Sequence, residues 1–109
     1  MKKAYIYLDD MRPSPTFVEE EYWLCAPKSV NAAIRDIELC ERNGCKDFIL
    51  DLDHDLGDYY NEGGDGYELV KWLIETGRNT KNYKIFCHSM NPVGRENILA
   101  LYKRYWKET

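Results

Sequence analysis

Three short hydrophobic runs of this chain each stop at residues that can bind metals or move protons. The runs end at Asp9-Asp10, at Asp53-His54-Asp55 and at His88-Ser89, and these positions include both histidines of the chain. Histidine titrates near neutral pH, and carboxylates are ligands for hard cations. Residues of these types at the ends of buried strands are typical of a site for acid–base or metal-assisted chemistry, because an open parallel sheet binds its ligands beyond the carboxyl ends of its strands.

The carboxylates at these strand ends predict a site for a divalent cation, Mg²⁺ or Mn²⁺. The candidate ligands are Asp9, Asp10, Asp53 and Asp55. Mg²⁺ takes one or two carboxylates and fills its remaining positions with water and phosphate oxygens. Adjacent carboxylates repel each other unless a cation or a shared proton relieves them. The alternative interpretation is that one of Asp9 and Asp10 caps a turn while the other is solvated.

Length and composition set the frame for this site. The chain has 109 residues, with 44% hydrophobic and 31% charged residues and a net charge of −4, which predicts one globular domain over residues 1–109. Because acidic and basic residues are mixed along the chain, binding to long duplex nucleic acid through its phosphates is not expected. A small phosphorylated ligand remains compatible with this charge.

The sequence predicts a cytoplasmic protein, or a nuclear one in a eukaryote, without membrane attachment. The apolar run after Lys2 and Lys3 ends at Asp9, which is too short for a signal peptide or a membrane span. The cysteines lack paired metal-ligand spacing and are interpreted as buried structural thiols; they are Cys25, Cys40, Cys45 and Cys87.

Strands and helices alternate along the chain. The hydrophobic patterns predict strands over residues 4–8, 22–26, 48–52 and 84–87, and helices over residues 30–42, 65–76 and 92–106. Ser29 and Asn91 are predicted helix caps, and Asp65 and Glu68 have the spacing of a capping box. Residues 11–21, with Pro13 and Pro15, and residues 57–64 are predicted loops.

Strands joined by helices must be parallel and have right-handed crossovers. The predicted fold class is therefore α/β, with a small parallel sheet of four strands in the order second, first, third, fourth. Helices are expected on both faces, partly because the first strand is apolar throughout.

The motifs resemble the receiver domains of two-component signalling, and more closely a divergent branch, the cyclic-phosphate-processing receiver-like domain. The shared motifs, which span nearly the whole chain, are Leu8-Asp9-Asp10-Met11-Arg12-Pro13, Leu52-Asp53-His54-Asp55-Leu56-Gly57, Gly66-Tyr67 and His88-Ser89-Met90-Asn91-Pro92-Val93-Gly94. The resemblance implies a flavodoxin-like fold, here truncated after the fourth strand and its helix, and a pocket rebuilt with histidines that processes cyclic phosphates.

Ordinary phosphorelay signalling is the weaker interpretation. A receiver clamps its aspartyl phosphate with a lysine at the end of a fifth strand, and this sequence ends after the helix that follows the fourth. His54 also follows the candidate aspartate directly.

Opening a cyclic phosphodiester needs a base that takes a proton from water and an acid that protonates the leaving alkoxide. His54 and His88 are the predicted pair, with Asp53 as a third catalytic group; the alternative for each histidine is a structural role. Asp51 is expected to hold a neighbouring histidine or to bond into the following loop. The predicted phosphate-binding residues are Arg12, Ser89, Asn91 and Gly94, the last two at a helix start.

Two functions fit these observations. The first is a hydrolase or phosphodiesterase that acts on a cyclic or terminal phosphate of a nucleotide or RNA end. The second is a non-catalytic receiver-like module that binds a nucleotide or a protein partner. A binding module has no need of two histidines and several carboxylates at one edge, which favours the enzyme. The ring isomer of the phosphate, the base, the metal and the oligomeric state are left open.

Overall fold

The computed structural model describes residues 2–15 and 22–107. Its elements follow in the order β1 (Lys2–Leu8), β2 (Tyr22–Cys25), α1 (Val30–Arg42), β3 (Cys45–Leu52), the 3-10 helix η1 (Gly57–Asn61), α2 (Gly66–Glu75), β4 (Tyr83–Cys87) and α3 (Pro92–Tyr105). The predicted type and order of the strands and α-helices are confirmed. β3 begins at Cys45 rather than Phe48, and the predicted loop over residues 57–64 contains η1. Part of the other predicted loop, residues 16–21, lies outside the described residues.

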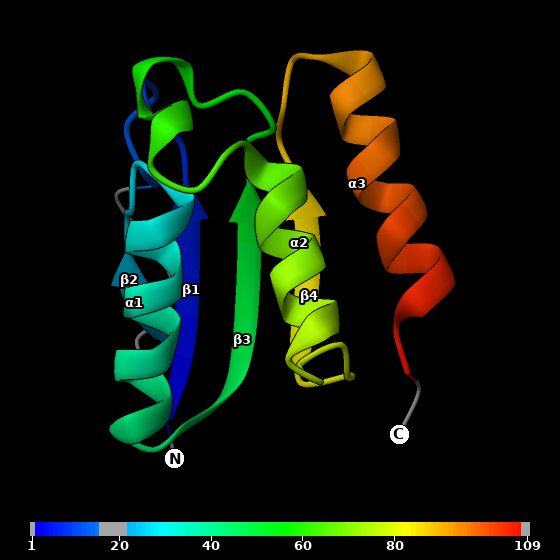
Figure 1. The fold of residues 1–109 in the computed structure, drawn as a ribbon. Coiled ribbons are helices and arrows are strands. Elements are labelled where there is room, and N and C mark those ends of the chain that lie inside the picture. Colours follow the sequence, from blue (N-terminus) through cyan, green and yellow to red (C-terminus); the bar gives the residue numbers. More distant parts are fainter. Residues whose placement is uncertain (1, 16–21, 108–109) are drawn as a thin grey trace.

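All four strands are parallel, in the predicted order β2-β1-β3-β4. Leu8 of β1 pairs with Leu52 of β3, and Leu52 pairs with Cys87 of β4. These three strands therefore end level with one another, at the upper edge of the sheet in Figure 1. The next residue of each strand stands at that edge, which places the motif residues side by side.

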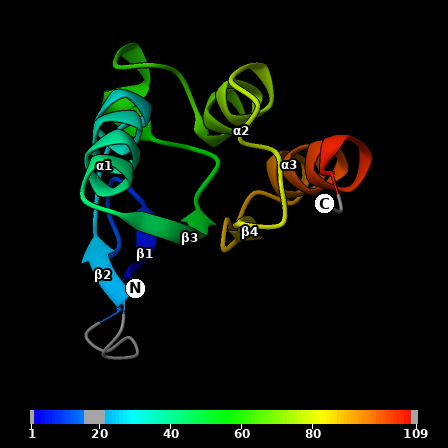
Figure 2. The same ribbon diagram turned by 90° about the horizontal axis from the view of Figure 1, so that it is seen from below.

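The core lies between the sheet and the helices. α1 packs on β1 and β3, α3 packs on β4, and α2 contacts both other helices. Figure 2 shows all three helices on the same side of the sheet. The buried core combines alternate strand residues with the inner helix faces, namely Ala4, Ile6, Leu8, Phe48, Leu50, Leu52 and Ile85 with Val30, Ala33, Ile37, Cys40, Leu69, Val70, Leu73 and Ile98.

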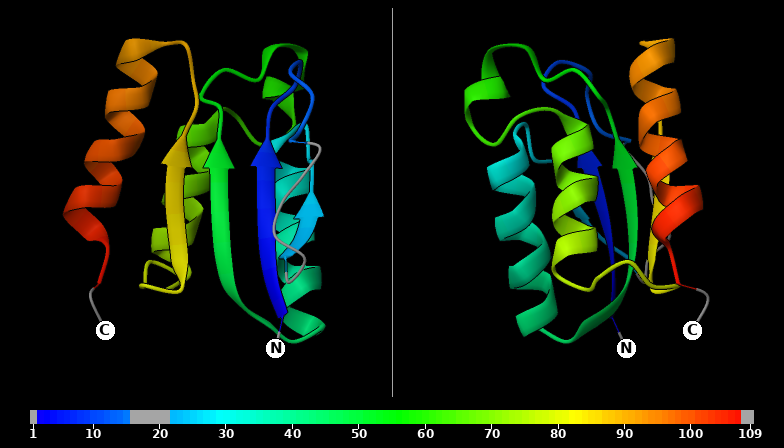
Figure 3. Two further views of the ribbon diagram at one scale, coloured as in Figure 1. Left: turned by 180° about the vertical axis from the view of Figure 1, so that it is seen from behind. Right: turned by 45° about the vertical axis from the view of Figure 1, so that its right-hand side comes forward.

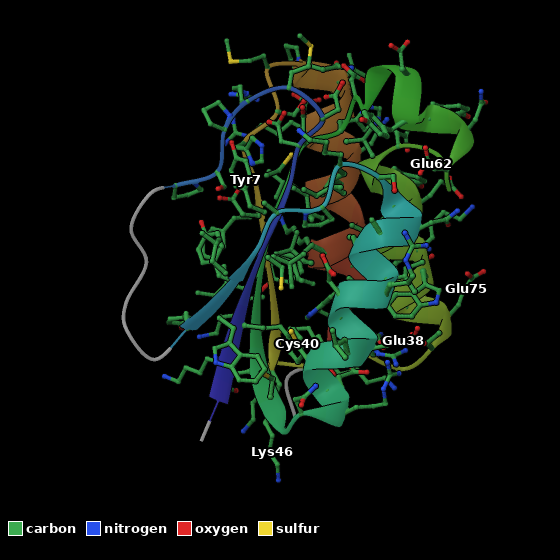
Figure 4. All side chains as sticks on the ribbon, turned by 90° about the vertical axis from the view of Figure 1, so that its left-hand side faces the viewer. Tyr7, Glu38, Cys40, Lys46, Glu62 and Glu75 are labelled. Atoms are coloured by element: carbon green, nitrogen blue, oxygen red, sulfur yellow. The ribbon has the colours of Figure 1, made fainter. Side chains whose placement is uncertain are left out.

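The opposite face of the sheet carries no helix of the described chain. Seen from behind, the strands lie in front of α1 and α2 (Figure 3, left). In Figure 4, Tyr7 lies on one side of the sheet, and Cys40, a residue of α1, lies on the other side. The expectation that helices cover both faces of the sheet is therefore wrong for the described residues. Right-handed crossovers that run in one direction along a sheet put their helices on one face. Only the step from β1 to β2 runs in the reverse direction, and its described part, with Pro13 and Pro15, forms no helix.

The helix starts explain how the loops of this edge are fixed. The Ser29 hydroxyl accepts a bond from the Ala32 N–H (3.1 Å), and Asn91 Oδ1 accepts one from the Gly94 N–H (3.0 Å). Asp65 stands at the start of α2, but its side chain makes no capping bond. Among the described residues, no helix has the length and apolar character needed to cross a membrane.

Candidate functional site

Asp9, Asp53 and His88 converge at the carboxyl edge of the sheet. One ligand atom of each residue lies within 4.8 Å of the others. The cause is the register of β1, β3 and β4, because each of the three residues directly follows a strand that ends level with its neighbours. The sequence-based expectation that Asp9, Asp53 and His88 lie close together is confirmed.

His88 is held between two carboxylates. Its Nδ1 lies 2.6 Å from Asp51 Oδ1, and its Nε2 lies 2.9 Å from Asp9 Oδ2. Tyr5 donates its hydroxyl to the other oxygen of Asp51 (2.6 Å), and the ring of Tyr7 stacks on the imidazole with centroids 4.6 Å apart. Burial disfavours the charged imidazole, but the bonds to Asp51 and Asp9 outweigh it and raise the pKa of His88. The two carboxylates thus favour the imidazolium over the neutral ring.

Asp9 has a positioning role at the start of the loop that follows β1. Its Oδ1 accepts the backbone N–H groups of Met11 (2.9 Å) and Arg12 (2.8 Å), and its Oδ2 faces His88 and Arg12 Nε (3.2 Å). Burial raises the pKa of Asp9, but these donors outweigh it and lower the pKa overall. The alternative interpretation that one of the paired aspartates caps a turn therefore holds for Asp9. These contacts use most of the lone pairs of a carboxylate.

Asp53 has the opposite electrostatic balance. Burial and the nearby charge of Asp9 raise its pKa, although the Ser89 side chain and the His54 N–H, 2.8 Å from Oδ1, act against the shift. The environments of two neighbouring carboxylates thus push their pKa values apart. Such a separation is a property of sites where one acidic group holds a charge and another moves a proton.

A cavity of about 480 Å³ opens beside Asp9 and Asp53. It is lined by Asp9, Asp10, Met11, Arg12, Asp53, Asp55, Gly57, Ser89, Met90 and Asn91. Most of the residues predicted from the sequence to bind metal or phosphate are in this lining. Its four aspartates outnumber its one arginine, so the charge of the lining disfavours an anionic ligand.

Arg12 contacts two loops at the edge of the sheet, one after β1 and one after β4. Besides Asp9, its guanidinium donates to the carbonyl oxygen of His88 (3.0 Å), and 43% of its side chain is exposed. It therefore links the loop after β1 to the loop after β4. Its position in the cavity lining is compatible with the predicted contact to a phosphate.

His54 lies in a second cluster of carboxylates. Its Nδ1 lies 2.7 Å from Asp55 Oδ1, and its Nε2 lies 3.4 Å from Asp65 Oδ2. Asn91 Nδ2 donates to Asp55 from the start of α3 (3.2 Å). The ring of His54 thus joins the loop after β3 to the starts of α2 and α3. Neither histidine is among the described residues that line the cavity, but Nε2 of His88 lies 2.9 Å from Asp9, which lines it. The structure does not bring the two histidines together as a contacting pair, because each ring has carboxylate partners of its own.

The structure explains the glycine at position 94 by packing against His54, and not by the expected close approach of the backbone to a phosphate. The residue is buried, its N–H is bonded to Asn91, and a Cβ atom at this position would collide with the ring of His54. The missing side chain therefore makes room for the imidazole.

Tyr7 contacts His88, Asp65 contacts His54, and Tyr5 contacts Asp51, which is the partner of His88. The sequence did not single out these three residues for this role. Tyr5 and Tyr7 precede Asp9 at a spacing of two, and this alternation could have placed them on the same side of β1 as His88. The contact of Asp65 with His54 depends on the path of a loop, for which the sequence holds no comparable signal.

A four-stranded parallel sheet with acidic residues at its carboxyl edge defines a receiver-like α/β domain. The family model of the cyclic-phosphate processing receiver domain matches residues 4–104, so the chain belongs to this family. Comparison with the curated proteins and with the solved structures gave no significant match.

Proposed function

We propose that this protein is a phosphoesterase that opens a cyclic phosphate of a nucleotide or an RNA end, with Asp53 as the base and His88 as the acid. The supporting observation is the spacing of the cluster. Because ligand atoms of Asp9, Asp53 and His88 lie within 4.8 Å of one another, one oxygen atom between them can lie at hydrogen-bonding distance, about 2.8 Å, from all three. The membership of the chain in the cyclic-phosphate processing family supports the substrate class.

The reaction is the addition of water across one ring P–O bond. Asp53 takes a proton from the water as its oxygen bonds to phosphorus. The ring P–O bond breaks, and the leaving alkoxide takes a proton from Nε2 of His88, which gives up its contact with Asp9. The product is a phosphomonoester. Asp51 and Asp9 orient the imidazole and favour its protonated form before the reaction, which is the state that an acid needs.

His54 has a different role in this proposal from the one the sequence suggested. Its ring nitrogens face Asp55 and Asp65, so we assign it to holding the loops around the cavity. A direct catalytic role of His54 remains a prediction, which the variants described below test.

The donor set of the cavity fits a hard divalent cation. Asp10 and Asp53 both line the cavity, and the described residues show no hydrogen bond to the Asp10 carboxylate, whereas Asp9 is occupied by its own donors. We propose Asp10 and Asp53 as the main ligands, with Asp55 nearby, for Mg²⁺ or Mn²⁺. When bound, the cation supplies positive charge against the four aspartates and the phosphate.

Three residues of the lining are proposed to contact the phosphate. Arg12 offers a partly exposed guanidinium, Ser89 a hydroxyl, and Asn91 an amide beside the start of α3. The proposed ligand is a small phosphorylated molecule, and the cytoplasm is the proposed compartment.

The first experiment is a turnover assay on a panel of 2′,3′- and 3′,5′-cyclic nucleotides and RNA ends with a terminal cyclic phosphate, with and without Mg²⁺ or Mn²⁺. We expect a phosphomonoester product and dependence on the cation. Binding of a panel member without turnover would instead support the non-catalytic binding module.

Matched variants then separate the two histidines. General acid–base groups contribute about 10²–10⁴-fold each, so His88→Ala and Asp53→Asn should lower kcat by about that factor at a temperature where both variants are folded. His54→Ala is the control and should affect Tm more than kcat. An equally large loss of kcat in folded His54→Ala would support the pair of histidines instead.

The pH profile gives an independent readout. Activity requires ionised Asp53 and protonated His88. It should therefore rise with pH as Asp53 ionises, at a pH that a bound cation lowers, and fall again through the pKa of His88, which lies above its ordinary value. Asp51→Asn should move the alkaline limb to lower pH, since it removes one of the charges that favour the imidazolium. An unchanged alkaline limb in this variant would argue against His88 as the acid.

A further inference from the structure

The lining of the cavity includes the two most exposed large apolar side chains of the described residues. Met11 is 83% exposed and Met90 is 84% exposed, and both line the cavity. They come from different loops, the first after β1 and the second after β4. Single exposed apolar residues are common on protein surfaces, but here the two most exposed ones line the same cavity.

The cavity is also larger than a phosphate group needs. Its volume of about 480 Å³ falls in the range of pockets that hold whole small molecules, about 300–1,000 Å³. Asp9 and Asp53 are the buried charged residues of its lining. The lining thus combines polar and charged groups, which suit the phosphate of the proposed substrate, with two apolar side chains.

We propose that Met11 and Met90 form a clamp that holds the nucleobase of a nucleoside cyclic phosphate. Thioether side chains are flexible and polarisable and make favourable contacts with aromatic rings. Every base offers such a ring face, whereas neither methionine offers a strong hydrogen-bonding group to a base edge. The clamp therefore binds a base without strong discrimination between bases. This inference rests on the proposed function of the same site and adds the part of the substrate that is recognised.

The kinetic test compares adenosine 2′,3′-cyclic phosphate with methyl riboside 2,3-cyclic phosphate, which has the same sugar and ring but no base. Met11→Ala and Met90→Ala should each lower kcat/KM for the adenosine compound by about 3–10-fold, mainly through KM. Turnover of the base-free compound should not change. Val93→Ala is the matched control, because Val93 is 67% exposed nearby but is not part of the cavity lining. The 3′,5′-cyclic pair is compared in the same way.

Equal losses on both compounds, or no loss on the adenosine compound, would overturn the clamp. A second measurement decides the question even if neither compound is turned over, in which case the proposed function fails. Protein labelled with [methyl-¹³C]methionine is titrated with each compound, and the two methyl signals are assigned with the alanine variants. Ring-current shifts of both signals with the adenosine compound alone would support the clamp. No shift, or the same shift with the base-free compound, would refute it.

Discussion

At the scale of single residues, His54 and Gly94 depend on each other. The imidazole occupies space that a Cβ atom at Gly94 would fill, and its two nitrogens face Asp55 and Asp65. The pair holds α3 against the loop after β3, next to the candidate site. A glycine of a capping motif thus acts through packing with a histidine of another motif.

Gly94→Ala should lower the free energy of unfolding by about 1–3 kcal/mol, because the added methyl overpacks the contact with His54. Without that contact, glycine to alanine in a helix stabilises by about 0.5–1 kcal/mol. The substitution should therefore stop being destabilising in a His54→Ala background. Chemical denaturation of the wild type, both single variants and the double variant measures this coupling. Equal costs of Gly94→Ala in both backgrounds would contradict it.

At the scale of elements, a polar network joins α1 to the turn after α2 and to β4. Arg78 binds both carboxylate oxygens of Glu41, with Nε 2.8 Å and Nη2 2.9 Å from them, and the hydroxyl of Tyr83 donates to the same carboxylate (2.5 Å). The guanidinium also lies over the ring of Trp72. This network lies at the end of the molecule opposite to the site, so it affects stability without touching the cavity.

Arg78→Ala should destabilise the fold by about 1.5–3 kcal/mol, the range for a hydrogen bond to a charged group, since both partners are largely buried. The surface pair Lys71–Glu68, 3.6 Å apart, supplies the control, and Lys71→Ala should cost at most about 0.5 kcal/mol. Denaturant unfolding of both variants measures the difference. Comparable losses would mean that the bidentate geometry adds nothing.

The same network has a pH dependence of known sign. The bonds from Arg78 are the main cause of the lowered pKa of Glu41; burial opposes them and the Tyr83 hydroxyl adds to them. A lowered pKa means that its stabilisation is complete above the ordinary value of 4.5 and is lost as the pH falls through the folded-state pKa. The difference in stability between the wild type and Arg78→Ala should accordingly shrink in acid.

At the scale of the whole molecule, the fold concentrates negative charge at one edge of the sheet. The net charge of the chain is −4, and four aspartates line a single cavity. The parallel arrangement causes this, because it brings the ends of all its strands to the same edge. The result is a molecule whose stability should respond to divalent cations.

Mg²⁺ or Mn²⁺ should raise the Tm of the wild type, because a ligand that binds only the folded state stabilises it. Asp53→Asn should raise the Tm without cation, since it removes repulsion with Asp9, and should reduce the shift on adding cation. Asp10→Asn should also reduce the shift, whereas Asp58→Asn, at an exposed position outside the described lining, should not. Calorimetry measures the Tm of all four proteins with and without cation. Equal cation-induced shifts in Tm would argue against the proposed ligands.

Much of the fold was predictable because local patterns determine it. Apolar runs and helical spacing predicted the elements, Ser29 and Asn91 predicted two helix starts, and the parallel order followed from the connecting helices. The pairing of Leu8 with Leu52 and of Leu52 with Cys87 follows if the three parallel strands end at the same level. For the same reason, the convergence of Asp9, Asp53 and His88 could be predicted.

The sequence by itself determined which residues reach the carboxyl edge, because strand ends are set by local hydrophobicity. Only the tertiary structure decided which of them meet. In the folded molecule His88 contacts Asp9 and Asp51, and His54 contacts Asp55 and Asp65. One face of the sheet carries no helix of the described chain. The physical reason is that contacts between side chains on different loops depend on rotamers and loop paths within a packed molecule, and no local pattern in the chain encodes them.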